Sequence, residues 1–248
     1  HQQNILPVVD AALKQAGVAK SELTAIAYTK GPGLLGSLLV GTFFAKSMAM
    51  GLNIPLIDVN HMQGHILAHF IQKKEKPKPI PNFPFICLTV SGGHTQIVLV
   101  KDHLSMELIG ETIDDAAGEA FDKAAKLLGL SYPGGPLVDE LSKEGDAERF
   151  TFTFPKVGEL NYSFSGLKTQ FLYFLQKEEK LNNKFIQQNL NDICASYQQH
   201  IVNYLFIKLK KAVANYNVKD VAISGGVSAN SCLRKTLEKT GQEEGWNT

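Results

Sequence analysis

The sequence has 248 residues, 44% of them hydrophobic, which is enough for one large buried core or two smaller ones. Its 25 Lys and Arg residues nearly balance 24 Asp and Glu residues, so a nucleic-acid or membrane partner would have to meet a local patch. Three isolated cysteines exclude a disulfide framework and a thiolate metal site and suit a reducing cytoplasm, and no signal peptide is recognisable.

The first part of the chain alternates helical and strand patterns, which predicts a layered α/β domain. The expected order is helix 4–16, strand 24–30, helix 37–51 and strand 54–59. Gly17 is the expected C-cap of the first helix and Ser37 the expected N-cap of the second. Two glycines and a lysine interrupt the apolar stretch 34–52, so we interpret it as a buried helix rather than a membrane span.

The stretch "NHMQGHILAHF" places His61, His65 and His69 four residues apart, on one face of a predicted helix. Two histidines at this spacing can bind one divalent ion, with a third ligand from elsewhere; the alternative is a half-exposed helix face. A zinc peptidase of the HExxH type needs a glutamate after the first histidine. Met62 stands there and Gln63 is not a base, so the sequence disfavours a peptidase.

The charged, proline-rich segment 73–84 breaks this alternation and predicts a domain boundary, with units 1–82 and 83–248. The second unit should form a further α/β lobe. Its expected elements are strands 85–90, 95–100 and 106–112, helix 114–129, a helical region over 182–213, strand 220–224 and helix 231–241.

Two glycine-rich turns follow predicted strands, "VSGGH" at 90–94 and "ISGGVSAN" at 223–230. Adjacent glycines let backbone N–H groups approach an anion, and the second turn leads into a helix whose N-terminus favours negative charge. A hairpin turn needs glycine as well, so one such turn is weak evidence for an anion-binding site. Two in one chain indicate a nucleotide or acyl-phosphate site.

Carboxylates accompany these turns. Asp122 lies eight residues after Asp114 and should share its helix face. Asp122 could accept hydrogen bonds from ribose hydroxyls, or it could form an ion pair with Lys126. Gly135, which has no side chain to cover the backbone, precedes Asp139 by about one helical turn.

The segment "SFSGLKTQ" contains Ser165 and Lys168 at the spacing of a Ser/Lys acylation pair. The companion motifs of that chemistry, SDN and KTG, are absent. A helix N-cap at Ser163 or Ser165 is the favoured interpretation, and no side chain is assigned as a nucleophile.

Five motifs in order, "HMQGH", "VSGGHTQ", "DDAAGEAFDKAAKLLGLSYPGGP", "SFSGLKT" and "SGGVSAN", resemble the tRNA N6-adenosine threonylcarbamoyltransferase family, particularly its bacterial and organellar branch. That family was formerly labelled O-sialoglycoprotein endopeptidase. The resemblance implies an actin/sugar-kinase/Hsp70-like (ASKHA) fold with two α/β lobes around a nucleotide cleft. It also implies transfer of threonylcarbamoyl from its adenylate to the N6 amine of the anticodon-adjacent adenosine, in tRNAs reading codons that begin with A.

By the same resemblance, His61 and His65 would hold one divalent ion per subunit, Fe²⁺ or Zn²⁺, and the bound nucleotide would be ATP or threonylcarbamoyl-adenylate. No role carries over to His69. The substrate-binding residues would be Thr89, Val90, Ser91, Gly92, Gly93, Asp122, Gly135, Asp139 and Asn230.

The sequence departs from the family pattern where Gln63 replaces the glutamate of "HMEGH". Segments like "GIETSCDDT" and "TDNAAM" are absent, and the aspartate that completes the metal site lies in the second. We therefore expect that this third ligand lies beyond the chain end and that the chain lacks both ends of the full protein. Such a fragment would hold an ion by two ligands and could itself be inactive.

The resemblance implies tRNA as substrate and, in bacteria, two partner proteins: a paralogous subunit of the same fold and an ATPase subunit. It implies a cytoplasmic protein with no membrane partner. Two alternatives stay open. The first is a non-catalytic ATP-binding scaffold subunit of the same complex, which has no need of a histidine pair; the second and more remote is a metallopeptidase.

Overall fold

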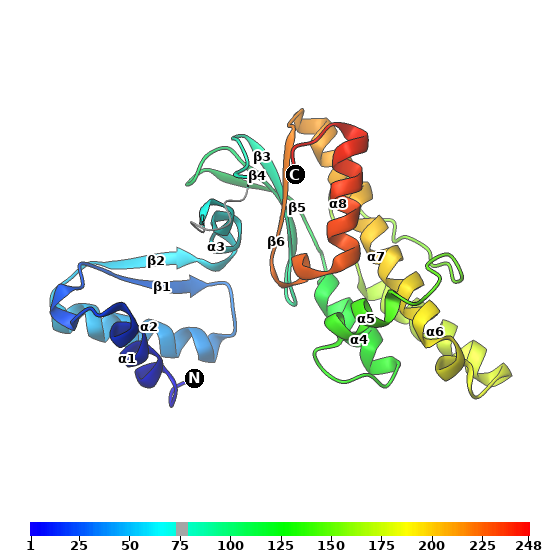
Figure 1. Cartoon of the computed structure of the whole chain (residues 1–248), viewed down its shortest axis with the longest axis horizontal. Coiled ribbons are helices and arrows are strands. Elements are labelled where there is room, and N and C mark those ends of the chain that lie inside the picture. The colour runs from blue at the N-terminus through cyan, green and yellow to red at the C-terminus, as the bar shows by residue number, and fades with distance from the viewer. Residues whose placement is uncertain (73–78) are drawn as a thin grey trace. The chain divides into compact units, whose positions relative to one another are not determined.

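The computed structural model describes residues 1–72 and 79–248, which divide into two compact units, His1–Ala68 and His69–Thr248 (Figure 1). The predicted boundary between residues 82 and 83 stays a prediction. Half of the predicted linker, residues 73–78, lies outside the described residues.

The first unit holds a two-stranded parallel sheet with helices beside it. Its elements are α1 (Ile5–Ala16), the 3₁₀ turn η1 (Lys20–Glu22), β1 (Ile26–Gly31), α2 (Leu35–Leu52), β2 (Leu56–Asn60) and α3 (His61–Leu67). The alternation predicted from the sequence is confirmed. Gly17 ends α1 with a φ of 66°, and its N–H donates to the Lys14 carbonyl, so the predicted C-cap is confirmed as well.

Helix α2 differs from its prediction in two respects. It begins at Leu35 with no side-chain cap, so the N-cap predicted at Ser37 is wrong. Only Ala45 and Ala49 are buried along it, because β1, β2 and α1 are the elements of this unit that pack against it, and they leave one side open. The prediction of a buried helix is therefore wrong for the described residues. By length and apolar composition alone α2 could cross a membrane, a test that core helices also pass.

The second unit is built on a four-stranded sheet in the order β5-β4-β3-β6. The strands are β3 (Phe85–Val90), β4 (Thr95–Val100), β5 (Met106–Glu111) and β6 (Asp220–Ser224). Strand β4 pairs antiparallel with β3 on one side and with β5 on the other, and the three strands predicted at 85–90, 95–100 and 106–112 are confirmed. Strand β6 joins the other edge parallel to β3, with Thr89 opposite Ser224.

Helices cover this sheet (Figure 1). They are α4 (Ala117–Leu127), α5 (Gly134–Ser142), α6 (Ser165–Leu181), α7 (Phe185–Tyr216) and α8 (Ser231–Glu244), and α7 contains a non-helical residue at Asn189. Alternate side chains of β3, Ile86, Leu88 and Val90, pack with these helices into one core. All six residues of β3 are buried, which explains why its sequence is a continuous apolar run rather than an alternating one.

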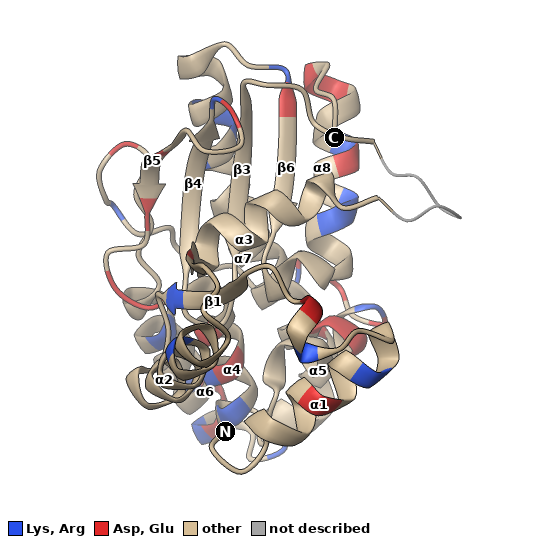
Figure 2. Ribbon diagram, turned by 90° about the vertical axis from the view of Figure 1, so that its left-hand side faces the viewer, with Lys and Arg blue, Asp and Glu red and all other residues tan. Residues whose placement is uncertain are grey.

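Charged residues of both signs are mixed on the helices; along α8, for example, basic and acidic positions alternate (Figure 2). This mixing agrees with the formal net charge of +1.

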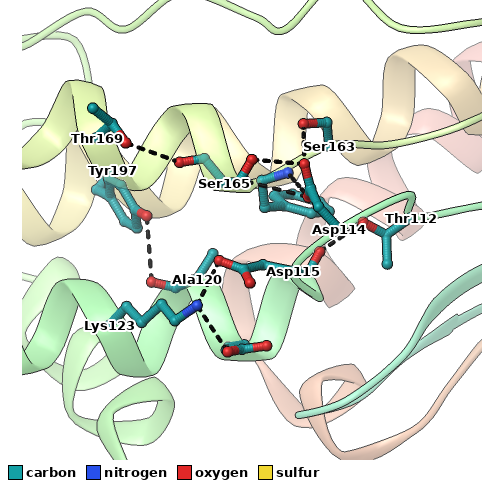
Figure 3. Close-up of polar contacts among 11 residues, drawn as sticks. Thr112, Asp114, Asp115, Ala120, Lys123, Ser163, Ser165, Thr169 and Tyr197 are labelled. Atoms are coloured by element: carbon teal, nitrogen blue, oxygen red, sulfur yellow. Dashed lines mark hydrogen bonds and ion pairs between the residues drawn. The ribbon is translucent and has the colours of Figure 1, made fainter.

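The helix predicted over 114–129 begins only at Ala117, because Asp114 serves another helix (Figure 3). Its carboxylate accepts hydrogen bonds from Ser163 Oγ at 2.5 Å, Phe164 N at 2.7 Å and Ser165 Oγ at 2.7 Å. Burial alone would raise the pKa of Asp114, but these donors lower it below its ordinary value.

Two further predictions fail for the same reason. The N-cap position of α6 is Phe164, with no side-chain cap of its own, so Ser163 and Ser165 do not cap the helix as predicted. Asp114 supplies the acceptor from across the fold instead. Because Asp114 lies outside α4, it cannot share a helix face with Asp122.

Candidate functional site

The two glycine-rich turns lie side by side at one end of the second unit's sheet. Strands β3 and β6 are parallel neighbours, so their C-terminal ends lie at the same end of the sheet, where they lead into residues 91–93 and 225–226 respectively. Just before the turns, the hydroxyl oxygens of Thr89 and Ser224 are 2.8 Å apart and buried.

Two glycines make this close arrangement possible. Gly225 has a φ of +87°, and a Cβ added to it would lie 2.3 Å from the carbonyl oxygen of Val90. A Cβ on Gly118, in the first turn of α4, would lie 2.5 Å from the carbonyl oxygen of Ser91. Side chains are therefore excluded where the second turn meets β3 and where α4 meets the first turn.

A cavity of about 460 Å³ opens beside the turns. The first two turns of α4 and of α5 and the segment leading into α8 form its walls, so several helix N-termini border it. It is lined by Gly92, Gly118, Phe121, Asp122, Tyr132, Pro133, Gly135, Pro136, Asp139, Glu140, Gly226, Val227, Ala229 and Asn230. At Gly92 and Gly226 an added Cβ would meet no atom within 4 Å, so the backbone there is open to a ligand.

Asp122 extends from α4 to the start of α5. Its Oδ1 accepts hydrogen bonds from the backbone N–H of Gly134 at 2.8 Å and of Gly135 at 3.4 Å. Among the described residues it forms no ion pair with Lys126, so that alternative is not supported. Oδ2 has no hydrogen-bond partner within the described part of the chain, which leaves one carboxylate oxygen for a ligand.

Asp139 and Asn230 connect α5 to α8. The Asp139 carboxylate accepts from Ser231 N at 3.0 Å and from Ser231 Oγ at 2.7 Å. Asn230 is the N-cap of α8, with its Oδ1 accepting from Leu233 N at 2.9 Å. The helix starts thus fix both side chains at the cavity wall.

The structure brings some of the predicted substrate residues together and leaves others aside. Those that line the cavity are Gly92, Asp122, Gly135, Asp139 and Asn230. Those that do not are Thr89, Val90, Ser91 and Gly93. Thr89 and Val90 are fully buried beneath the turn, and Ser91 Oγ accepts a hydrogen bond from His94 N within it.

Among the lining residues that the sequence did not predict are Gly118, Phe121 and Tyr132. A glycine early in an alanine-rich helix was the available signal for Gly118, because such a residue often marks close backbone packing. Tyr132 is 85% exposed at the mouth of the cavity, and nothing in its local sequence pattern distinguishes it from an ordinary turn residue.

The histidine pair begins α3 in the first unit. Asn60 caps this helix, since its Oδ1 accepts from Met62 N at 2.9 Å and from Gln63 N at 3.2 Å. The Nε2 atoms of His61 and His65 lie 3.2 Å apart, with the ring centroids at 4.5 Å. For an ion about 2.1 Å from each nitrogen, the angle between the two nitrogens at the ion would be roughly 100°. This value lies between those of octahedral and tetrahedral coordination, so the pair fits two ligands of one ion.

Within residues 1–72 and 79–248, no third His, Cys, Asp or Glu side chain joins this pair to form a metal site. No group of three or more His, Cys, Asp or Glu side chains that could hold a metal occurs among the described residues. Helix α3 ends at Leu67, and His69 lies in the following 3₁₀ turn η2 (Ala68–Phe70). The prediction that all three histidines share one helix is therefore wrong, and the fit rests on His61 and His65.

Solved structures identify the fold class. Full-length HypF in a phosphate- and nucleotide-bound form is similar with a TM-score of 0.62 and 15% identity, over 98% of this chain and 45% of that one. Component A of (R)-2-hydroxyglutaryl-CoA dehydratase from Acidaminococcus fermentans has a TM-score of 0.52 and 17% identity, over 96% of this chain and 74% of that one. The chain is thus an α/β protein of the actin/sugar-kinase/Hsp70-like class, as predicted.

Sequence comparison gives the family within that class. The family model of tRNA N6-adenosine threonylcarbamoyltransferase matches residues 1–248, and the chain belongs to this family. The protein of that name from Christiangramia forsetii is 60% identical over 246 residues, which are 99% of this chain and 72% of the relative. Its counterpart from Riemerella anatipestifer is 57% identical, over 100% of this chain and 72% of the relative. The counterpart from Chromobacterium violaceum is 46% identical, over 96% of this chain and 69% of the relative.

Proposed function

We propose that this chain carries the adenylate-binding and metal-binding parts of a tRNA N6-adenosine threonylcarbamoyltransferase. The protein is an acyltransferase that threonylcarbamoylates tRNA. The acceptor is the N6 amine of the adenosine beside the anticodon, in tRNAs reading codons that begin with A. The observation that carries the proposal is the convergence of five predicted substrate residues on one cavity beside two glycine-rich turns.

In this proposal the cavity binds the adenylate half of threonylcarbamoyl-adenylate, or ATP. The phosphate lies against the open backbone at Gly92 and Gly226, where N–H groups can donate to it. Asp122 and Asp139 would repel a phosphate and instead accept hydrogen bonds from the ribose hydroxyls. Binding energy gathered at the adenylate then holds the reacting carbonyl in place, so positioning contributes most of the rate enhancement.

His61 and His65 would hold one divalent ion, Fe²⁺ or Zn²⁺, through their Nε2 atoms. When bound, such an ion supplies Lewis-acid polarisation of an acyl oxygen. The protein groups need only orient the donor and the attacking amine, and no side-chain nucleophile is required. Ser165, the candidate of the Ser/Lys type, donates its hydroxyl to Asp114 and holds a helix end.

We also propose that the protein works in the cytoplasm together with a paralogous subunit of the same fold and an ATPase subunit. Mixed charges along helices such as α8, and a formal net charge of +1, give this chain little attraction of its own for a polyanion. Partner proteins would then supply part of the surface that holds tRNA.

The test is mass spectrometry of tRNA nucleosides from cells depleted of the full-length protein. Threonylcarbamoyl-adenosine should disappear and return with the wild-type gene. It should not return with His65→Ala, which removes half of the histidine pair. With Asp122→Asn, which keeps an acceptor for the α5 amides, it should return only in part. Unchanged modified nucleoside after depletion would refute the proposed function.

A further inference from the structure

The wall of the cavity that carries Asn230 is backed by a chain of hydrogen bonds leading into the protein. Asn230 Nδ2 donates to Gln198 Oε1 at 2.6 Å, and Gln198 Nε2 donates to Ser142 Oγ at 2.6 Å. The Ser142 hydroxyl donates in turn to the carbonyl oxygen of Asp139 at 2.8 Å. The chain runs from the N-cap of α8, through α7, to the end of α5, and returns to a residue that also lines the cavity.

The direction of every bond in this chain follows from one backbone group. The N–H of Leu233 can only donate, so the Asn230 atom facing it is the amide oxygen. The Asn230 nitrogen must therefore face Gln198, whose oxygen accepts and whose nitrogen is left to donate to Ser142. Because Ser142 gives its single proton to Asp139, it must accept from Gln198. No amide in the chain can be reversed without placing two donors or two acceptors together.

Gln198 is the middle of this chain and is only 3% exposed. A glutamine is rarely buried to this extent without partners, because an unsatisfied amide is costly away from water. Here both ends of the amide are satisfied, and both partners belong to helices that form the cavity wall. Gln198 lines a separate cavity and not this one, so it can act on a ligand bound here only through its neighbours.

From this geometry we infer that Gln198 is a positioning residue for the adenylate site: anchored on Ser142 at the end of α5, it fixes the orientation of the Asn230 amide. With its oxygen turned to Leu233 and one N–H turned to Gln198, Asn230 presents a defined second N–H to the cavity. The inference rests on the proposed function, since it takes the cavity as the adenylate site. Asp139 is fixed at the same joint, through its bonds to Ser231.

Calorimetric titration of the full-length protein with ATP tests this role. Gln198→Met keeps the length of the side chain and removes both polar ends, and should weaken ATP binding about 3- to 10-fold, the usual worth of one or two neutral hydrogen bonds. Asn230→Ala should weaken it at least as much. The double variant should bind ATP like Asn230→Ala alone, because Gln198 acts through Asn230. In the transfer reaction, Gln198→Met should raise KM for the adenylate donor with little change in kcat.

Ser196→Ala is the matched control. Ser196 lies two residues away on α7, and it accepts from Phe150 N and donates to the Asp146 carbonyl, both at 3.1 Å, without lining the cavity. This variant should lower the melting temperature and leave ATP affinity unchanged. If Gln198→Met does not fold, Ser142→Ala breaks the next link at a less buried position and should weaken ATP binding by a smaller factor.

The outcomes separate the two claims. Equal ATP affinity in Gln198→Met and wild type, or effects of Gln198→Met and Asn230→Ala that multiply in the double variant, would overturn the positioning role while leaving the proposed function intact. Unchanged ATP binding in Asn230→Ala would overturn the assignment of the cavity itself.

Discussion

Asp122, Asp139 and Asn230 each perform two tasks at the scale of single residues. One side of each group satisfies a helix N-terminus, of α5 for Asp122 and of α8 for the other two. All three side chains also line the cavity, and Asp122 keeps one carboxylate oxygen without a partner among the described residues. A helix start that is capped by a ligand-binding side chain holds that side chain in one rotamer, so the site is ordered before a ligand arrives. Substitutions at these positions will therefore lower both stability and affinity, which is why the variants above carry stability controls.

His200 illustrates a residue whose chemistry concerns stability alone. It is buried on α7, stacked on Phe154 with ring centroids 4.4 Å apart, and its Nε2 has no hydrogen-bond partner among the described residues. Burial lowers the pKa of His200 from 6.5 to about 4, and a backbone contact with Thr153 offsets this only in part.

The consequence is a loss of stability in acid. Between pH 6.5 and 4, His200 is protonated in the unfolded chain and neutral in the folded chain. The free energy of unfolding therefore decreases as the pH is lowered, by up to about 3 kcal/mol. His200→Phe keeps the aromatic stacking and removes the titration. Urea denaturation across this pH range should show a shallower decline for the variant. If the free energy of unfolding fell equally with decreasing pH in His200→Phe and in wild type, His200 would not be the source of the acid sensitivity.

At the scale of elements, the sequence predicts regular structure well where pattern and period decide. The alternation of the first unit, the β3–β4 hairpin, β5, β6 and the glycine end of α1 all follow from local residues. Two of the failures occur where distant residues compete. Helix α4 begins late, and α6 begins without its own cap, because Asp114 bonds to residues about 50 positions later in the chain.

That competition leads to a prediction for α6. Replacing Asp114 with alanine removes an acceptor for two hydroxyls and the backbone N–H groups of Phe164 and Ser165. Because the carboxylate is partly exposed, the expected loss in free energy of unfolding is about 1 to 2 kcal/mol. The pKa of Asp114 is lowered, so this stabilisation is present above the unfolded pKa of about 3.9 and disappears as pH falls below it.

Chemical denaturation measures the effect, with Glu107→Ala as the control. Glu107 forms an exposed ion pair with Lys101 in the same unit, and its loss should leave stability nearly unchanged. Equal stability of Asp114→Ala and wild type would show that α6 does not depend on this cap.

The site itself divides in the same way. The sequence motifs indicated glycine turns and carboxylates, and five of the nine predicted substrate residues, Gly92, Asp122, Gly135, Asp139 and Asn230, do line one cavity. The parallel pairing of β3 with β6, which brings the turns together, is a long-range contact that no local pattern encodes. The role of Gln198 could not be predicted from the sequence for the same reason, since its hydrogen-bond partners lie on α5 and at the start of α8.

At the scale of the whole molecule, the two units contribute different chemistry. The first contributes a pair of imidazoles at the start of a capped helix, and the second contributes a cavity beside two glycine-rich turns, lined by carboxylates. Neither set suffices for transfer of an acyl group from an adenylate. A metal alone does not position the donor, and a nucleotide cavity alone does not polarise the carbonyl.

The central claim, that the cavity between the glycine turns and α5 binds the adenylate, is tested most directly by a crystal structure of the full-length protein with ATP bound. We predict adenosine in this cavity, with a ribose hydroxyl within hydrogen-bonding distance of Asp122 or Asp139 and phosphate oxygens against the backbone at Gly92 and Gly226. ATP bound elsewhere, with this cavity empty, would contradict the account.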